Sequence, residues 1–413
     1  MTIQVSVIVP TCNRLELLNR CLAALVEQTF DPSAYEIIVV DDAASQATQR
    51  LVNDWAERAG NVPGTHKGYP ALQYIPVTAT HGPAAARNLG WRSAIGEIIA
   101  FTDDDCIPDR QWLRAGVEKF QPDVIGVSGR LIMPLMTVPT DYERNALALE
   151  RSAFITANCF YRREAIAQVN GFDQRFTLPW REDSDLLFTL LKQFDIDTRS
   201  DDHLSQFPFV PGQGWITESP QDQRVQPTAV FAPLASQFWG EQEPTSPRIG
   251  GFRDLAELTS VVHSFKNGCK LVYAPDAIVV HPIRPAAWGV SLKQQRKSFF
   301  NALLYKKHPE LYRRWLAPVT PWHYYGIVGA LSLTLAALLF IGLNPANQVA
   351  IGIAILASLI WLILTTRFCL RRLQGTSHNF SHAAEMVVTS VLIPPLSLFW
   401  RLLGAISFRV VFF

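Results

Sequence analysis

The sequence predicts an α/β protein, with a mostly parallel, Rossmann-like sheet flanked by helices, followed by a C-terminal segment of transmembrane helices. The first observation is an alternation of apolar, β-branched runs with helical patterns in the N-terminal part. Such an order is typical of right-handed crossovers and parallel strands. The second observation is that residues 315–366 contain no Asp, Glu, Lys or Arg. A segment of this kind is unsuited to an ordinary soluble surface.

The predicted elements follow from these patterns in order. Val5–Val9 is a β-branched run closed by Pro10, typical of a buried parallel strand. Glu16–Gln28 carries leucines at helical spacing, which predicts an amphipathic helix. The pattern then predicts a strand, a helix, a strand and a further strand; these are Tyr35–Val40, Ser45–Arg58, Leu72–Val77 and Ile98–Phe101. Later segments predict short strands over Val124–Val127 and Arg130–Met133, a strand over Phe154–Tyr161 and a helix over Phe252–Phe265.

Polar residues stand where these strands end. Ligands of open α/β sheets bind outside the carboxyl ends of the strands. The residues expected there are Thr11, Arg14, Asp41, Asp42, Asp103 and Asp105. Asp103 and Asp105 form a D-x-D pattern on one side of an extended backbone, which suits a divalent cation and its phosphates. The alternatives are a solvated acidic turn for the D-x-D and a helix cap for Asp41 and Asp42.

A turn and a small-residue helix lie between the third strand and the D-x-D. Gly82 and Pro83 punctuate the turn, and the alanines that follow allow the helix to approach another backbone closely. Arg87 on this helix could direct its planar donors at a diphosphate. The alternative is a surface arginine on a packed helix.

Four segments together resemble the family 2 glycosyltransferases of the GT-A fold: Val7–Thr11, Val39–Asp42, Gly82–Asn88 and Asp103–Asp105. The resemblance covers about the first 190 residues and resumes near Lys270. It implies that Asp41 and Asp42 hold the base and ribose of a nucleotide sugar, and that the D-x-D holds Mg²⁺ or Mn²⁺. The expected donor-binding residues are Pro10, Thr11, Arg14, Asp41, Asp42, Arg87, Asn88, Asp103 and Asp104, and the expected metal ligands are Asp103, Asp105 and His281.

An acidic pair opens a later apolar helix. In the family, the pair matched by Glu182 and Asp183 includes the catalytic base, and we expect Asp183 to be that base in an inverting transfer. The alternative is that these acids only complement the helix dipole. His281 ends the strand that begins at Lys270, and the alternative to a metal or diphosphate contact is a simple hydrogen bond. Processive relatives carry a Q-x-x-R-W motif, but no Trp follows Arg296, which favours transfer of a single sugar.

The sequence predicts two domains. Residues 1–315 form a GT-A domain, with a nucleotide-sugar half over 1–120 and an acceptor half over 121–315. An irregular insertion over 195–251 either covers the acceptor, contacts a partner or is a surface loop. Residues 322–413 form a membrane domain with spans near 324–343 and 349–366. A third apolar segment over 387–413, broken by two prolines, is either a kinked span or an interfacial helix.

Basic residues flank the two spans on their outer ends, and none lies between the spans. Both outer ends are therefore expected in the cytoplasm. Further basic residues precede the first span and could attract anionic headgroups or a lipid diphosphate, or simply form a solvated face. They are Lys293, Arg296, Lys297, Lys306, Lys307, Arg313 and Arg314.

These patterns predict a metal-dependent enzyme of the inner membrane with a cytoplasmic catalytic domain. The net charge of +1 gives no sign of a nucleic-acid partner, and the six scattered cysteines suit a reducing compartment. The N-terminus lacks the basic region of a signal peptide. The expected partners are a nucleotide-diphosphate sugar, a lipid-linked or cell-envelope glycan acceptor and membrane lipids. The alternatives are a processive polysaccharide synthase and a non-catalytic nucleotide-sugar-binding scaffold.

Overall fold

The computed structural model describes residues 3–60, 70–135, 138–196, 268–316 and 321–412. They divide into two compact units. The first holds residues 3–60, 70–134, 149–196 and 268–282, and the second holds 135, 138–148, 283–316 and 321–412. The second unit includes segments 138–148 and 283–315, which were expected in the catalytic domain. The expected domain limits stay a prediction. Nearly all of the insertion over 195–251, and a helical pattern that follows it, lie outside the described residues.

The first unit contains an eight-stranded sheet with the order β3-β2-β1-β4-β7-β6-β8-β5. Its first half is parallel and consists of β1 (Val5–Thr11), β2 (Tyr35–Asp41), β3 (Ala71–Pro76) and β4 (Ile98–Phe101). The helices that follow β1, β2 and β3 are α1 (Leu15–Val26), α2 (Gln46–Gly60) and α3 (Pro83–Ser93). A short 3₁₀ turn, η1 (Pro32–Ala34), precedes β2. Strands β2 and β4 are buried along their whole length, as their apolar runs predict.

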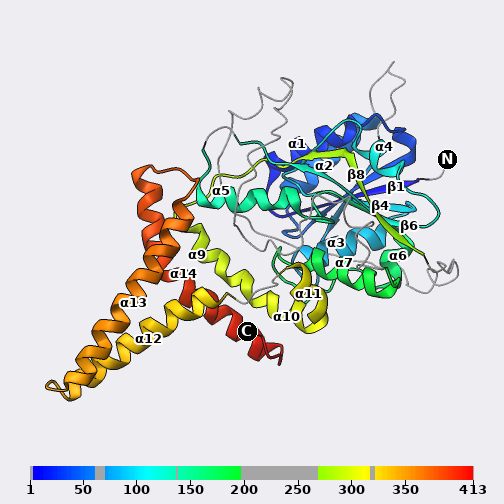
Figure 1. Cartoon of the computed structure of the whole chain (residues 1–413). Coiled ribbons are helices and arrows are strands. Elements are labelled where there is room, and N and C mark those ends of the chain that lie inside the picture. Colours follow the sequence, from blue (N-terminus) through cyan, green and yellow to red (C-terminus); the bar gives the residue numbers. More distant parts are fainter. Residues whose placement is uncertain (1–2, 61–69, 136–137, 197–267, 317–320, 413) are drawn as a thin grey trace. The chain divides into compact units, whose positions relative to one another are not determined.

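The second half of the sheet is mixed. It contains β5 (Ile107–Pro108), β6 (Val124–Ile132), β7 (Cys159–Arg162) and β8 (Lys270–Val280). Four of the seven strand pairs in the sheet are parallel, so the predicted mostly parallel α/β fold is confirmed. The helices here are α4 (Trp112–Val117), α6 (Arg163–Gln168) and α7 (Glu182–Gln193) (Figure 1). The 3₁₀ turn η2 (Leu147–Arg151) contains the point at which the chain passes from the second unit back to the first.

Two strands differ from their sequence-based predictions. The sequence suggested separate strands over Val124–Val127 and Arg130–Met133, but β6 is continuous because a register shift between Gly129 and Arg130 absorbs the irregularity. The strand predicted over Phe154–Tyr161 begins only at Cys159. Phe154 has a φ of 56°, which is incompatible with an extended strand.

Helix α3 lies against β1 and β2 at Gly90. A Cβ atom there would come within 3.0 Å of Val40 Cγ2 and still closer to Ile8 Cγ2. The close packing thus occurs at Gly90 against side chains, and the approach of the alanines to another backbone stays a prediction. The packing at Gly90 fixes the helix over the sheet and so places Arg87, nearly one turn earlier, near the carboxyl ends of the strands.

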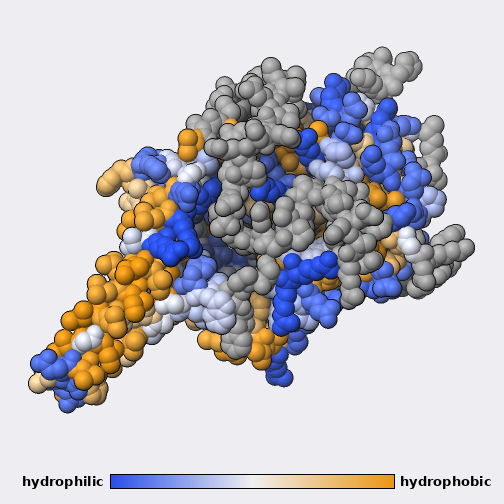
Figure 2. Space-filling view, in the orientation of Figure 1, coloured by the Kyte–Doolittle hydropathy of each residue, from blue (hydrophilic) through white to orange (hydrophobic). Residues whose placement is uncertain are grey.

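The second unit is helical. Its short helices are α5 (Asp141–Ala146), α9 (Val290–Gln294), η5 (Gln295–Lys297), α10 (Ser298–Lys307) and α11 (Pro309–Trp315). Its long helices, α12 (Trp322–Leu343), α13 (Gln348–Leu373) and α14 (Phe380–Ser407), are each long and apolar enough to cross a membrane. Figure 1 shows α12 and α13 as a long hairpin, and in Figure 2 its sides are hydrophobic whereas its tip is hydrophilic.

The third apolar segment differs from the prediction in its limits. The sequence suggested residues 387–413, whereas α14 begins at Phe380 and ends at Ser407, with Pro394 and Pro395 inside the helix. The observed α13 also continues beyond the predicted 349–366, as far as Leu373. Apolar composition marks only the part of a helix that suits hydrocarbon, so polar turns at its ends are missed.

Candidate active site

Three consecutive aspartates follow β4, and their carboxylates have different partners. Asp104 points back toward β1, where its two oxygens accept hydrogen bonds from Thr11 Oγ1 at 2.7 Å and Arg14 Nη1 at 3.0 Å. Burial raises the pKa of Asp104 to about 6, although Arg14 acts in the opposite direction. Asp104 therefore holds the end of β1 and positions Arg14, whose side chain is 39% exposed.

Asp103 takes part in a buried chain of charges. Arg87 donates from Nη2 to Asp103 Oδ1 at 2.8 Å and from Nη1 to Glu182 Oε1 at 3.0 Å. The side chain of Arg87 is only 4% exposed, so it is not the surface arginine that the sequence left as an alternative. Both terminal nitrogens of its guanidinium thus hold carboxylates of this site.

The two carboxylates that share Arg87 have different pKa values. Burial alone would raise the pKa of Asp103, but Arg87, His281 and Arg14 outweigh it and the pKa lies below the usual value. Burial dominates at Glu182 and raises its pKa to about 7, against the opposing effect of Arg87. Asp103 therefore stays ionised at neutral pH, whereas burial disfavours the ionised form of Glu182.

Glu182 and Asp183 begin α7 after an unusual residue. Arg181, directly before them, has a φ of 77°, which only a minority of non-glycine residues adopt. Asp183 is half-buried, and its Oδ1 accepts hydrogen bonds from the backbone nitrogen and the hydroxyl of Ser184. Glu182 is buried with Arg87, so the two adjacent acids lie in clearly different environments.

A second group of possible ligands lies at the end of β8. His281 Nε2 is 3.6 Å from Asp105 Oδ1, and donor atoms of Asp105, Cys106 and His281 lie within 4.8 Å of one another. His281 Nδ1 is buried and has no hydrogen-bond partner among the described residues. Carboxylate and imidazole donors suit Mn²⁺, whereas Mg²⁺ favours oxygen ligands. The group includes Asp105 and His281, as predicted, but it contains Cys106 in place of Asp103.

Asp41 and Asp42 face different ways at the end of β2. Asp41 is fully buried and accepts hydrogen bonds from Ala43 N, Ser45 N and the Tyr74 hydroxyl. Asp41 therefore holds the turn that leads into α2. This role resembles the helix cap that the sequence left as an alternative. Asp42 accepts from Gly82 N and contacts His81 Nδ1 at 3.1 Å, which ties this strand end to the start of α3.

Two predicted donor-binding residues have structural contacts. Asn88 is 1% exposed, and its amide donates to Phe172 O and accepts from Phe172 N and Trp91 Nε1. Pro10 is half-buried in β1, opposite Val40. Their donor contacts stay predictions, and Asn88 also anchors the loop that precedes α7.

Comparison with known proteins assigns the N-terminal part of the chain to a family. Residues 6–169 match the family model described as glycosyl transferase family 2. The chain carries a family 2 glycosyl transferase domain. The resemblance seen in the sequence is therefore confirmed.

The chain is also similar to several individual proteins. Glycosyltransferase AglE of Haloferax volcanii is 29% identical over 178 residues, which are 41% of this chain and 55% of the relative. The poly(ribitol-phosphate) beta-N-acetylglucosaminyltransferase TarS of Staphylococcus aureus is 26% identical, over 42% of this chain and 31% of the relative. The matches thus span about half or less of these relatives. A mannosyltransferase from Pyrobaculum calidifontis, solved with GDP-Man and Mn²⁺, is 18% identical with a TM-score of 0.45, covering 89% of this chain and 87% of that one.

The first unit thus presents acids, two arginines and a histidine around the ends of β1, β4 and β8 and the start of α7. The predicted residues brought together here by direct contacts are Thr11, Arg14, Arg87, Asp103, Asp104, Asp105, Glu182 and His281. Sequence analysis missed Cys106, although it adjoins the D-x-D, and His81, which adjoins the Gly82 turn. Neither residue belongs to the four segments that resemble the family, so only their neighbours in the structure mark them as candidate site residues.

Proposed function

We propose that this protein is an inverting glycosyltransferase, which moves one sugar from a nucleotide-diphosphate sugar to a membrane-associated acceptor. The observation that carries the proposal is the Arg87 bridge, which joins Asp103 of the family 2 domain to Glu182 in the same unit. The bridge ties the D-x-D to the acidic start of α7, so donor-binding and acceptor-activating groups share one rigid support. In many enzymes, preorganised charge of this kind makes the largest single contribution to stabilising the transition state.

A divalent cation, Mn²⁺ or Mg²⁺, fits the donor side of this site. Asp105 and His281 would hold it, with the Cys106 thiol alongside and Asp103 nearby in the D-x-D. The bound cation would neutralise the charge that develops on the departing diphosphate. Arg14 is available for the same diphosphate, because its side chain is partly exposed and Asp104 binds only Nη1 of its guanidinium among the contacts described above.

Asp183 is the proposed catalytic base. Its carboxylate is half-buried at the start of α7, whereas Glu182 is buried and committed to Arg87. A base must reach the hydroxyl of the acceptor and accept its proton as the hydroxyl attacks the anomeric carbon. Glu182 therefore positions Arg87, and Asp183 takes the proton. One base opposite the leaving group implies inversion.

The acceptor is proposed to be lipid-linked or part of a cell-envelope glycan. Three helices long and apolar enough to cross a membrane follow the family 2 domain in the chain, so a membrane would deliver such an acceptor. The basic residues outside the α12–α13 hairpin favour an inner-membrane protein with a cytoplasmic catalytic domain. The absence of Trp after Arg296 supports transfer of a single sugar rather than processive synthesis.

The test is turnover of UDP, GDP and dTDP sugars by the full chain in nanodiscs, with and without Mn²⁺ and with membrane lipid extract. We expect Mn²⁺-dependent release of nucleotide diphosphate and a product with one added sugar. Asp183→Asn should lower turnover by about 10²- to 10⁴-fold but still bind donor. Asp123→Asn is the matched control, because Asp123 forms an exposed ion pair with Lys270 and should leave turnover unchanged.

Other outcomes would select a different function. Products that grow by many sugars before release would favour a processive synthase. Donor binding without turnover in the presence of lipid extract would favour a scaffold. Failure to bind any of the donors would contradict the proposed enzyme altogether.

A further inference from the structure

The last turns of α13 carry three arginines in two kinds of environment. Arg372 is buried, and its guanidinium donates to Asp141 Oδ2 at 2.8 Å, Thr389 Oγ1 at 2.7 Å and Ser390 Oγ at 3.1 Å. Arg367 and Arg371 are exposed, and within the described parts of the chain neither has an ion pair or a hydrogen bond. The helical unit therefore uses one arginine for its own packing and leaves two cations available.

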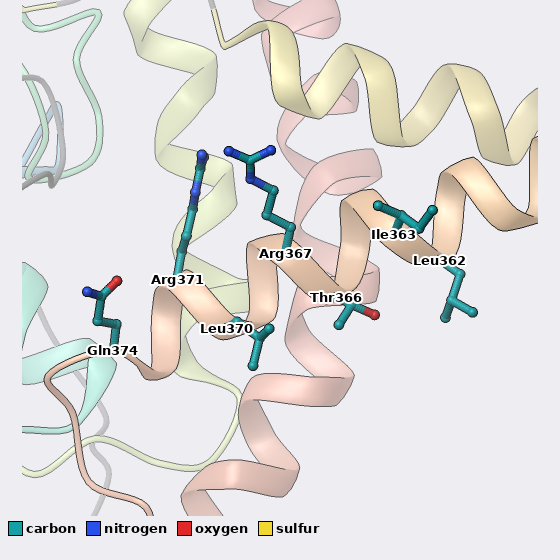
Figure 3. A pocket seen from close by; sticks show the side chains of 7 residues that line it. All are labelled: Leu362, Ile363, Thr366, Arg367, Leu370, Arg371 and Gln374. Carbon is teal, nitrogen blue, oxygen red and sulfur yellow. The ribbon is translucent and has the colours of Figure 1, made fainter.

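The two available arginines line a shallow pocket on the surface of α13 (Figure 3). The other lining residues are Leu362, Ile363, Thr366, Leu370 and Gln374. All seven fall in two rows with a spacing of four, one running through Ile363, Arg367 and Arg371 and the other from Leu362 to Gln374. Rows of this spacing form ridges on a helix, so the pocket is the groove between two ridges.

The polarity of this groove changes along the helix. Leu362 and Ile363 are 54% and 64% exposed at one end, whereas Arg371 and Gln374 lie at the other. None of the seven lining residues is acidic. In Figure 3 the side chains of Arg367 and Arg371 extend to the same side of α13. The groove is thus complementary to a molecule with an apolar tail and an anionic head.

Neighbouring aromatic residues indicate how deep the groove would lie in a bilayer. The Phe368 ring, next to Arg367, contacts His323 at 6.0 Å and Tyr324 at 5.4 Å between ring centroids, at the start of α12. Trp322, at the first position of α12, is 66% exposed. Trp and Tyr gather where a membrane meets water. The 26 residues of α13 would extend about 39 Å, longer than a hydrocarbon core of about 30 Å, so its last turns reach the headgroups.

We propose that this groove binds one anionic phospholipid of the surrounding membrane. Arg367 and Arg371 hold the phosphate of the headgroup, because planar guanidinium donors match phosphate oxygens in geometry and charge. An acyl chain then runs along Leu362 and Ile363 toward the bilayer core. This inference rests on the membrane insertion assumed in the proposed function, but not on catalysis.

Native mass spectrometry of the detergent-solubilised full chain, titrated with phosphatidylglycerol, tests this site. The wild type should retain one phosphatidylglycerol and bind phosphatidylcholine more weakly. Arg367→Gln/Arg371→Gln should bind phosphatidylglycerol about 30-fold more weakly, because it removes two cations next to a lipid phosphate. If this double variant aggregates, Arg371→Gln alone should weaken binding about fivefold.

A matched control separates a built site from diffuse attraction. Arg50→Gln/Lys119→Gln removes the same charge from exposed residues of the first unit, outside the groove and outside the basic segment that precedes α12, and it should bind phosphatidylglycerol like the wild type. Equal weakening in the two double variants, or none in either, would overturn the proposal. So would equal affinity for phosphatidylcholine, or displacement by a lower concentration of a polyprenyl diphosphate, which would assign the groove to an acceptor lipid. Mn²⁺-dependent donor turnover, measured separately, shows whether the proposed function stands independently.

Discussion

Glu182 and Asp183 are adjacent in the sequence, yet their carboxylates differ in burial and in hydrogen-bond partners. Glu182 is 3% exposed and bound to Arg87, whereas Asp183 is half-buried and hydrogen-bonded only to its neighbour Ser184 among the contacts described above. The sequence placed both acids at a helix start, but no local pattern shows which of them an arginine 95 positions earlier will contact. The periodicity of apolar residues does not predict long-range ion pairs of this kind, because they depend on how separate elements pack.

The raised pKa of Glu182 predicts a pH-dependent stability. Burial raises this pKa from 4.5 to about 7, so between these values the folded protein binds more protons than the unfolded chain. The free energy of unfolding must therefore fall as the pH rises through this window, by up to about 3 kcal/mol from this group. Glu182→Gln cannot titrate but keeps an oxygen for Arg87, so it should gain stability relative to the wild type between pH 5 and pH 8.

Thermal unfolding of both proteins in detergent at several pH values measures this difference. The raised pKa of Asp104 is present in both proteins and cancels in the comparison. Parallel profiles of unfolding temperature for the two proteins would show that Glu182 does not titrate in this range.

At the scale of elements, the contact of α3 with the sheet depends on a missing side chain. Gly90→Ala would push a methyl group into Ile8 and Val40, both of which are fully buried in adjacent strands. Overpacking of this kind costs about 1–3 kcal/mol and should lower the unfolding temperature of the family 2 domain. Gly329→Ala is the control, because this exposed glycine of α12 has no atom within 4 Å of the added Cβ and the change should be close to neutral. Equal effects of the two changes would mean that α3 has room to move.

A buried ion pair links three helices of the second unit. Arg372 of α13 binds Asp141 of α5 and two hydroxyls of α14, and His382 Nε2 accepts a hydrogen bond from Asp141 N. Arg372→Gln leaves the buried carboxylate of Asp141 with Arg144 as its one ion-pair partner among the described residues, and we expect a loss of about 3–5 kcal/mol in the free energy of unfolding. The change should lower the unfolding temperature in detergent, and adding Asp141→Asn should restore part of it.

The adjacent arginine supplies the control for this pair. Arg371→Gln alters an exposed side chain and should change stability by less than about 0.5 kcal/mol. Similar losses for Arg371→Gln and Arg372→Gln would show that helix charge in general, and not the buried pair, stabilises the unit. The sequence treated both arginines alike, as topology signals, because it could not show that α5 reaches α13.

For the whole molecule, the sequence predicted the elements that follow from residue type and from their order in the chain. It did not predict the features that depend on packing between distant segments. Apolar runs predicted the parallel half of the sheet and the α12–α13 hairpin, because strand burial and membrane solubility both depend on residue type. The continuity of β6 and the place of Cys106 beside His281 were missed, because each depends on a partner far away in the chain. The start of α14 was missed because apolar composition does not mark the first turn of a helix. The D-x-D was predicted as a motif, but the separate partners of its three aspartates were not.

The proposed membrane topology makes the last prediction. If α12 and α13 cross the membrane as a hairpin with basic outer ends in the cytoplasm, its turn near Ala346 lies outside. In intact cells, a membrane-impermeant maleimide should label Ala346→Cys in a Cys12→Ser background. The native Cys12, which is exposed in the family 2 domain, should react only after the membrane is permeabilised, whereas the other five cysteines are buried and should stay unlabelled in the folded protein. Labelling of Cys12 in intact cells would place the catalytic domain outside, where cytoplasmic nucleotide sugars could not reach it, and would contradict both the topology and the proposed donor.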